Sequence, residues 1–138
     1  MDHNCFGNKK GFTLVEIIAV LVILGILAAV AVPKYMDMAA EARNKAACAA
    51  IDEIRSRLAS VQNKYLMNYN GMPPTSIQLY QYATGPDGYN DATGIANIGE
   101  DFSATVTSGT PILITVTAVK GVSISPGITN TFKAFGDN

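Results

Sequence analysis

The sequence predicts an α+β protein in which a long N-terminal helix first spans a membrane and then packs on a small antiparallel sheet of three or four strands. Three observations predict this class. Residues 17–32 contain no charged or hydrogen-bonding side chain. After residue 36, apolar residues recur at helical spacing, which is typical of an amphipathic helix. After residue 100, short β-branched runs alternate with polar residues, which is typical of strands.

The apolar segment has the length that a bilayer requires. Residues 12–32 form a helix of about 21 residues and about 31 Å, close to the thickness of the hydrocarbon core. Lys9 and Lys10 precede this segment, and basic residues favour the cytoplasmic side. The sequence therefore predicts a single-pass helix with its N-terminus in the cytoplasm and the C-terminal part outside the inner membrane.

Glu16 interrupts this apolar pattern. A carboxylate at the centre of a bilayer costs about 2.5 to 3.5 kcal/mol on insertion scales, and less near an interface. One interpretation is an acid that is tolerated because it stays hydrated near the headgroups. The other is an acid that is retained for a function.

The stretch KKGFTLVE, residues 9–16, resembles the cleavage and methylation signature of type IV pilins and of type II secretion pseudopilins. The resemblance is specific up to about residue 45, and beyond that it is architectural. It implies that a prepilin peptidase cuts between Gly11 and Phe12 on the cytoplasmic face and methylates the new amine of Phe12. It also implies that Glu16 meets the Phe12 amine of a neighbouring subunit during filament assembly.

These implied roles agree with the chemistry of the residues. Gly11 has no side chain to obstruct a peptidase at the backbone. The cut would precede the apolar run, whereas an ordinary secretory signal is cleaved after it, so the helix would survive processing. A Glu16 carboxylate becomes acceptable in the membrane when the Phe12 ammonium neutralises it.

The resemblance divides the chain into a leader, a helix and a head with the type IV pilin fold. The leader is residues 1–11, the transmembrane and filament-core helix is residues 12–35, and the extracytoplasmic head is residues 36–138. Pro33 is expected to bend the helix, because it cannot bond the carbonyl of Ala29. The resemblance adds that such helices melt locally between a glycine and a proline, here Gly25 and Pro33, when packed in a filament.

The head is predicted to contain the second half of the helix at 36–68, a loop region at 69–99 and the sheet at 100–138. The expected apolar stripe of the helix consists of Met36, Ala40, Ala47, Ile51, Ile54, Leu58, Val61 and Tyr65. Residues 77–82 fit either a short helix or a strand, and residues 83–99 are expected to be a loop. Predicted strands are 102–106, 111–119 and 122–124, with a tight turn at 119–122 and a fourth strand at 131–135.

The cysteines do not allow a disulfide within the mature chain. Cys5 lies in the predicted leader, so Cys48 would be the single remaining thiol, whereas many pilins staple their C-terminal region with a disulfide. Cys48 lies in an alanine-rich helical stretch. There a small buried apolar residue is the favoured interpretation, with a reactive or intermolecular thiol as the alternative.

The sequence offers little catalytic chemistry. The one histidine is His3, in the predicted leader, and the formal net charge is −1, so neither an enzyme nor a nucleic-acid binder is predicted and no cofactor is expected. Asp87, Asn90 and Asp91 are a weak calcium candidate, and a turn-rich loop is favoured over a metal site. The tyrosines cluster around the end of the helix and the loop and are expected to pack structurally between subunits: Tyr35, Tyr65, Tyr69, Tyr80, Tyr82 and Tyr89.

The resemblance implies a pilin subunit that polymerises into a type IV pilus with identical or related pilins. Its expected partners are the prepilin peptidase, an inner-membrane assembly platform and, before assembly, inner-membrane lipid. It would be an inner-membrane precursor and later an extracellular or periplasmic filament. A pseudopilin of type II secretion is the alternative. A monomeric membrane-anchored binding protein is a third possibility, which does not explain Gly11 and Glu16.

Overall fold

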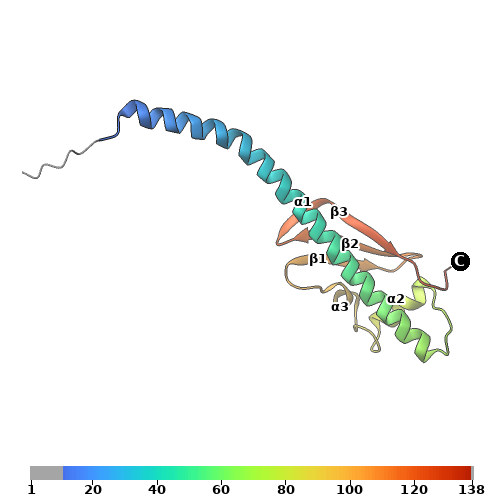
Figure 1. The fold of residues 1–138 in the computed structure, drawn as a ribbon. Helices are drawn as coiled ribbons and strands as arrows, with labels where there is room; N and C mark the ends of the chain where they lie inside the picture. Colours follow the sequence, from blue (N-terminus) through green and yellow to red (C-terminus); the bar gives the residue numbers. More distant parts are fainter. Residues whose placement is uncertain (1–10, 138) are drawn as a thin grey trace, which may run out of the picture. The chain divides into compact units, whose positions relative to one another are not determined.

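The structure, a computed structural model, describes residues 11–137. Its elements are α1 (Leu14–Asn68), α2 (Ser76–Thr84), α3 (Ala92–Ala96), β1 (Phe102–Thr107), β2 (Ile112–Val119) and β3 (Val122–Phe132) (Figure 1). The chain forms two compact units, Met1–Ala39 and Ala40–Asn138, and α1 continues through both. Residues 1–10 of the predicted leader, with Cys5, His3 and the basic pair, lie outside the described residues.

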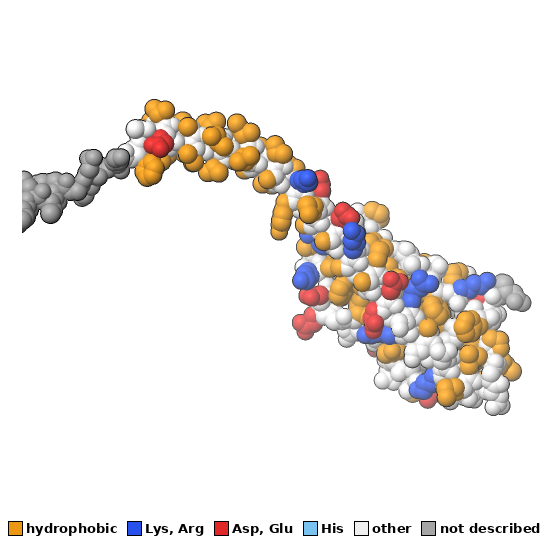
Figure 2. All heavy atoms as spheres, in the orientation of Figure 1, with side chains coloured by type: hydrophobic (Ala, Val, Ile, Leu, Met, Phe, Trp, Pro, Cys, Tyr) orange, Lys and Arg blue, Asp and Glu red, His pale blue; other side chains and the backbone are white. Residues whose placement is uncertain are grey.

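The first unit consists of the N-terminal part of α1. Its large apolar side chains are exposed from Phe12 to Met38, and Figure 2 shows hydrophobic side chains along the visible face of this part of the helix. By length and composition, α1 is suited to cross a membrane. The helix contains Gly25 and Pro33 without interruption. The local melting expected between these two residues applies to a packed filament and stays a prediction.

The second unit contains a closed hydrophobic core between α1 and the sheet. Figure 1 shows the second half of α1 lying across the three strands. Ile54 and Leu58 on the helix and Ile112, Ile114 and Val116 on β2 are completely buried. The core begins at Ala46 and Ala47, so this unit encloses its own apolar face without the N-terminal part of the helix.

The predicted stripe on α1 is confirmed from Ala47 to Tyr65 and wrong before it. Met36 and Ala40 are exposed, because the closed core between the helix and the sheet begins only at Ala46. The expectation that Cys48 is buried is also wrong, since its side chain lies on the exposed side of α1. Helical periodicity explains this: position 48 follows the buried Ala47 by one residue and therefore points about 100° away from it.

The region between α1 and the sheet is more ordered than the predicted loop. Residues 77–82, which fitted helix or strand, belong to α2, which Thr75 and Gln78 cap reciprocally. Within 83–99, predicted to be a loop, Asp91 caps the short helix α3. Ile95 and Ala96 on α3 bury their side chains in the core, which the polar composition of the segment concealed.

Arg57 fastens this region to the long helix. Its guanidinium donates to the carbonyl of Asn97 at 2.7 Å and lies 5.8 Å from the ring centre of Tyr89. Its Nε donates to Glu53 at 3.0 Å. A residue on the polar side of the helix thereby anchors the segment that follows α2.

The sheet is antiparallel, with the order β1-β2-β3. The tight turn between β2 and β3 is confirmed, since Val119 pairs with Val122 and both Lys120 and Gly121 have positive φ. The fourth strand predicted at 131–135 is wrong. Residues up to Phe132 continue β3, which passes through Pro126 because β3 is an edge strand and a proline there need not donate to a neighbour.

The C-terminal tail is held against the start of α2. Ser76 is completely buried, and its backbone N–H donates to Asp137 Oδ1 at 2.9 Å. The Ser76 hydroxyl also donates to Asp137 Oδ2 and accepts from the Ala134 N–H at 3.2 Å. The Gly136 N–H donates to the Pro74 carbonyl at 2.9 Å. We call Ser76 and Asp137, with these bonds, the C-terminal clasp.

Candidate processing and assembly site

The predicted processing site lies at the exposed beginning of the first unit. Phe12 is 79% exposed, and an ideal Cβ built on Gly11 meets no heavy atom within 4 Å. Among residues 11–137, no atom therefore crowds the position where a side chain at residue 11 would project. The fold itself makes no demand for glycine at this position.

Thr13 organises the start of the helix, a role that the sequence analysis missed. The Glu16 N–H bonds to the Thr13 carbonyl at 3.1 Å and to its hydroxyl oxygen at 3.3 Å. Thr13 thus acts as the N-cap and Glu16 is the third residue of α1. The spacing of threonine and glutamate, T-x-x-E before an apolar run, was the signal that could have revealed this cap.

The Glu16 carboxylate lies in the first turn of α1, among exposed apolar side chains. A negative charge here is favourable for the helix, because the N-terminal end of the helix dipole is positive. None of the ion pairs between residues 11 and 137 includes Glu16. The carboxylate therefore has no cationic partner within the described part of its own chain.

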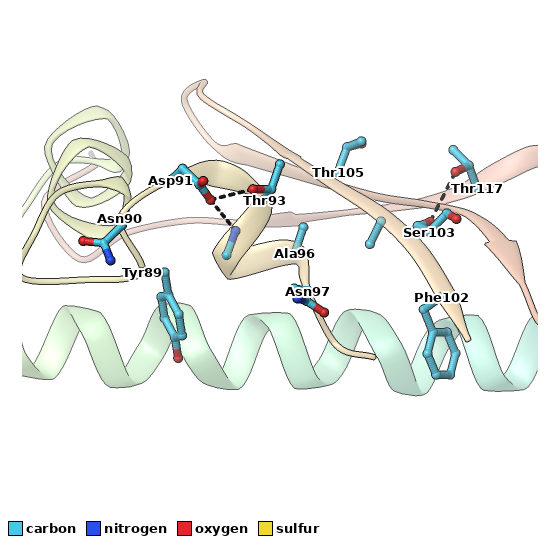
Figure 3. Close-up of a pocket in the computed structure, with 12 residues that line it drawn as sticks. Tyr89, Asn90, Asp91, Thr93, Ala96, Asn97, Phe102, Ser103, Thr105 and Thr117 are labelled. Carbon is cyan, nitrogen blue, oxygen red and sulfur yellow. Dashed lines mark hydrogen bonds between the residues drawn. The ribbon is translucent and has the colours of Figure 1, made fainter. Parts of the chain in front are cut away.

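The weak calcium candidate does not form one ligand set. Asn90 and Asp91 line a hollow of about 630 Å³ between α3 and β1 (Figure 3), whereas Asp87 lines a separate hollow of about 300 Å³ beside Tyr69 and Tyr82. Asp91 Oδ1 accepts from the Thr93 hydroxyl at 2.7 Å and from the Gly94 N–H at 2.5 Å. Among residues 11–137, no three acidic, histidine or cysteine side chains converge as metal ligands would.

Asp91 is therefore explained as a helix cap. The bond from the Thr93 hydroxyl, followed by the bond from the Gly94 N–H, lowers the pKa of its carboxyl below the ordinary value. Figure 3 shows both bonds directed at the same carboxylate, with the Asn90 side chain pointing elsewhere. The arrangement favours the turn-rich loop that the sequence analysis preferred.

Three of the six tyrosines form one cluster at the end of α1. Tyr65 and Tyr69 stack with ring centres 4.2 Å apart, and the Tyr82 ring stands edge-on to both. The Asn68 amide donates to the Tyr82 hydroxyl at 2.6 Å. The cluster packs α1 on α2 within one chain, whereas the sequence analysis expected tyrosine contacts between subunits.

The structure defines a class of protein with a closed α+β head and a long helix that has an acidic residue in its first turn and an N-terminal part long and apolar enough to cross a membrane. A family model described as a prokaryotic N-terminal methylation motif matches residues 7–32. The chain is 35% identical over 101 residues to the major component of the type IV narrow pilus of Thermus thermophilus, covering 72% of this chain and 78% of that relative. The chain belongs to the type IV pilin family.

Other relatives match over the N-terminal region. A type IV major pilin protein of Neisseria gonorrhoeae is 38% identical over 65 residues, which are 47% of this chain and 37% of that protein. A fimbrial protein of Moraxella nonliquefaciens is 40% identical over 52 residues, 38% of this chain and 34% of that protein. No solved structure shows a significant match to the chain. The relatives support a structural pilin subunit, and none of those described here favours a secretion pseudopilin.

Proposed function

We propose that this pilin is made as an inner-membrane precursor, cleaved between Gly11 and Phe12, methylated on the Phe12 amine and polymerised into a type IV pilus. A prepilin peptidase would perform both modifications. An assembly platform in the inner membrane would add the subunit to a filament of identical or related pilins. The precursor has its N-terminus in the cytoplasm, and the head lies outside the membrane.

One observation carries this proposal: the apolar N-terminal part of α1 is exposed from Phe12 to Met38, while the head completes its core without it. Burial of apolar surface contributes about 25 cal/mol per Å², so a helix this apolar needs a cover. Lipid provides the cover before assembly. The equivalent helices of other subunits provide it afterwards.

The glycine at the cut serves the peptidase. Since a Cβ at position 11 would meet no atom of residues 11–137 within 4 Å, a larger residue there is expected to leave the fold of those residues unchanged. A processing defect in a Gly11 variant is then a failure at the peptidase, where the scissile backbone must be approached closely.

Glu16 selects and positions an incoming subunit. Its carboxylate lies in the first turn of α1, where processing creates a cation at Phe12 of each mature chain. Pairing the Glu16 carboxylate with the Phe12 ammonium of a neighbour neutralises both charges in a medium of low dielectric constant. Gly25 and Pro33 then allow the helix to open locally as the subunits pack.

The variant Glu16→Val tests this role. Removing the charge makes the helix more apolar, so membrane insertion is expected to be unchanged or improved. Filament yield, counted by electron microscopy of sheared cells, is expected to fall strongly, and Glu16→Asp is expected to retain part of it. Glu41→Gln is the matched control, because Glu41 is an exposed acid paired with Lys45 at 2.8 Å on the same helix. Full piliation with Glu16→Val would refute the proposed pairing.

A further inference from the structure

A hollow of about 300 Å³ lies in the head beside the C-terminal ends of α1 and α2. Three tyrosines, two glutamines and residues 85–87 line it, and all of them belong to the second unit. The volume is at the lower end of the range found for small-molecule pockets. The hollow therefore has room for one small ligand.

Three aromatic rings line this hollow. Tyr65 and Tyr69 stack with ring centres 4.2 Å apart, and the Tyr82 ring centre lies 5.2 Å from that of Tyr65 and 6.3 Å from that of Tyr69. Tyr69 is 49% exposed and Tyr82 is half-buried, so a ligand from solvent can reach both rings. The face of an aromatic ring carries negative partial charge and attracts a cation within about 6 Å of the ring centre. The three rings favour a cation over an anion.

Asp87 gives the hollow a full negative charge. Among the residues of 11–137 that line the hollow, Asp87 is the only charged one. Its carboxylate takes part in none of the ion pairs or side-chain hydrogen bonds within that range. Lys64 donates to the Asp87 backbone carbonyl, but the Lys64 side chain lines a different hollow, beside Ser60 and Gly88. The Asp87 carboxylate is therefore available to a ligand.

Two helix ends add to the negative potential. α1 ends at Asn68 and α2 ends at Thr84, and residues from the last turn of each helix line the hollow. The C-terminal end of a helix carries partial negative charge, which a basic side chain in the last turn can neutralise. Neither of these last turns contains a basic residue. Both helix ends therefore stabilise a cation in the hollow.

The hydrogen-bonding groups of the wall favour a cation without N–H donors. The Gln78 side-chain oxygen already accepts from the Thr75 N–H at 3.0 Å and from the Thr75 hydroxyl at 3.2 Å. The Tyr82 hydroxyl accepts from the Asn68 amide at 2.6 Å. A primary ammonium or a guanidinium would lose hydration at a wall where these acceptors are occupied. A quaternary ammonium has no N–H group to satisfy, and its methyl groups can pack on the rings.

We propose that this hollow binds a quaternary ammonium group of the choline type. The methyl groups contact the rings of Tyr69 and Tyr82, and the positive charge faces the Asp87 carboxylate. Binding is independent of the proposed cleavage and polymerisation, because every lining residue belongs to the head. Such a group occurs in free choline and in phosphocholine headgroups, and the two sources share this chemistry.

Titration of the purified full-length chain with choline chloride tests the site. NMR of tyrosine labelled with ¹³C in the ring is expected to show shifts that saturate with a Kd on the order of 1 mM, as a few cation–π contacts at a partly exposed site would give. The chain is kept in a maltoside detergent, because a phosphocholine detergent would itself occupy the hollow. Sodium chloride at equal concentration is the control for ionic strength and is expected to leave the signals unchanged.

Variants separate the contribution of the ring from that of the charge. Tyr69→Ala is expected to weaken choline binding about tenfold, whereas Tyr69→Phe keeps the ring and is expected to retain the affinity. Asp87→Asn preserves the shape of the side chain, and it is expected to weaken binding roughly threefold to fivefold at low salt. Tyr35→Ala and Asp101→Asn are the matched controls, because both residues are exposed and neither lines the hollow. Their Kd is expected to equal that of the parent.

A neutral ligand of the same shape decides whether the charge matters. In 3,3-dimethylbutan-1-ol a carbon replaces the choline nitrogen, and this alcohol is expected to bind at least tenfold more weakly than choline. Equal binding of the two would overturn the proposal. So would choline shifts that do not saturate, or a Kd that both Tyr69→Ala and Asp87→Asn leave unchanged.

Glycerophosphocholine distinguishes the two sources of the group. Tighter binding than that of choline would assign the site to a phosphocholine headgroup, and weaker binding would assign it to the free amine. A chain that binds choline but is never cleaved or polymerised would overturn the proposed function and leave this site standing.

Discussion

The C-terminal clasp is predicted to replace the disulfide that many pilins use to hold this region. In Asp137→Ala, the fully buried Ser76 loses the acceptor of both its N–H and its hydroxyl proton. A buried donor without a partner costs about 1 to 3 kcal/mol, and bonds to a charged acceptor are worth about 1.5 to 3 kcal/mol each. Because Asp137 is partly exposed, water compensates for some of this loss. We therefore expect Asp137→Ala to lower the free energy of unfolding by about 2 kcal/mol.

The assay is thermal unfolding of a soluble fragment, residues 36–138, which contains the complete core of the head. For a domain of this size, about 2 kcal/mol corresponds to a decrease of roughly 8 to 16 °C in Tm. Asp101→Ala is the matched control, because the Asp101 side chain is exposed and makes no hydrogen bond or ion pair within residues 11–137. Its Tm is expected to change by less than about 2 °C.

The effect also has a predicted pH dependence. The Ser76 hydroxyl, as the largest cause, lowers the pKa of the Asp137 carboxyl below its ordinary value of 3.8. Because the pKa of this carboxyl is lower in the folded state, its stabilising effect is fully present above the pKa that it has in the unfolded state. The effect is lost as the pH falls through the pKa that it has in the folded state. The difference in Tm between the parent and Asp137→Asn should therefore shrink below about pH 4. A Tm that is the same in both at pH 7, or a gap that does not change down to pH 2, would refute the reasoning.

Three other predictions test separate parts of the account. Gly11→Val is expected to leave an uncleaved precursor with its head folded, which immunoblotting and limited proteolysis would detect; normal cleavage would remove the assigned cut site. Ile54→Ala, at a completely buried position, should lower the stability of the fragment by about 3 kcal/mol, whereas Ile77→Ala, at a position 48% exposed, should cost less than about 1 kcal/mol; equal losses would contradict the described core. Calcium is expected to leave the Tm of the fragment unchanged within about 2 °C, because Asp91 caps α3; an increase of roughly 10 °C that Asp91→Ala abolishes would restore the calcium site and favour a secretion pseudopilin.

Much of the architecture was predictable because it depends on local patterns. The buried side of α1 from Ala47 to Tyr65 follows helical periodicity, and the turn at Lys120 and Gly121 follows from residues between two β-branched runs. The strands β1 and β2 follow from β-branched and other apolar residues that alternate with polar ones. In each case the residues near in sequence determine the structure, so the sequence alone contains the information.

Several of the errors occur where contacts with distant segments determine the structure. Nothing near Met36 indicates that the sheet stops short of it, and the length of β3 beyond Pro126 depends on its place at the edge. The C-terminal clasp joins residues 61 positions apart, and no periodicity reveals such a bond. At the proposed processing site, the KKGFTLVE stretch indicated Gly11, Phe12 and Glu16, whereas the capping role of Thr13 was recognised from the geometry of the helix start, although the T-x-x-E spacing also signals it.

The measurement that tests the central claim most directly is the intact mass of subunits taken from sheared surface filaments, together with fragmentation of the N-terminal peptide. The account predicts filaments whose subunits begin at Phe12 and carry one methyl group on its amine. Filaments whose subunits retain residues 1–11, begin at another residue or carry an unmodified Phe12 amine would contradict it.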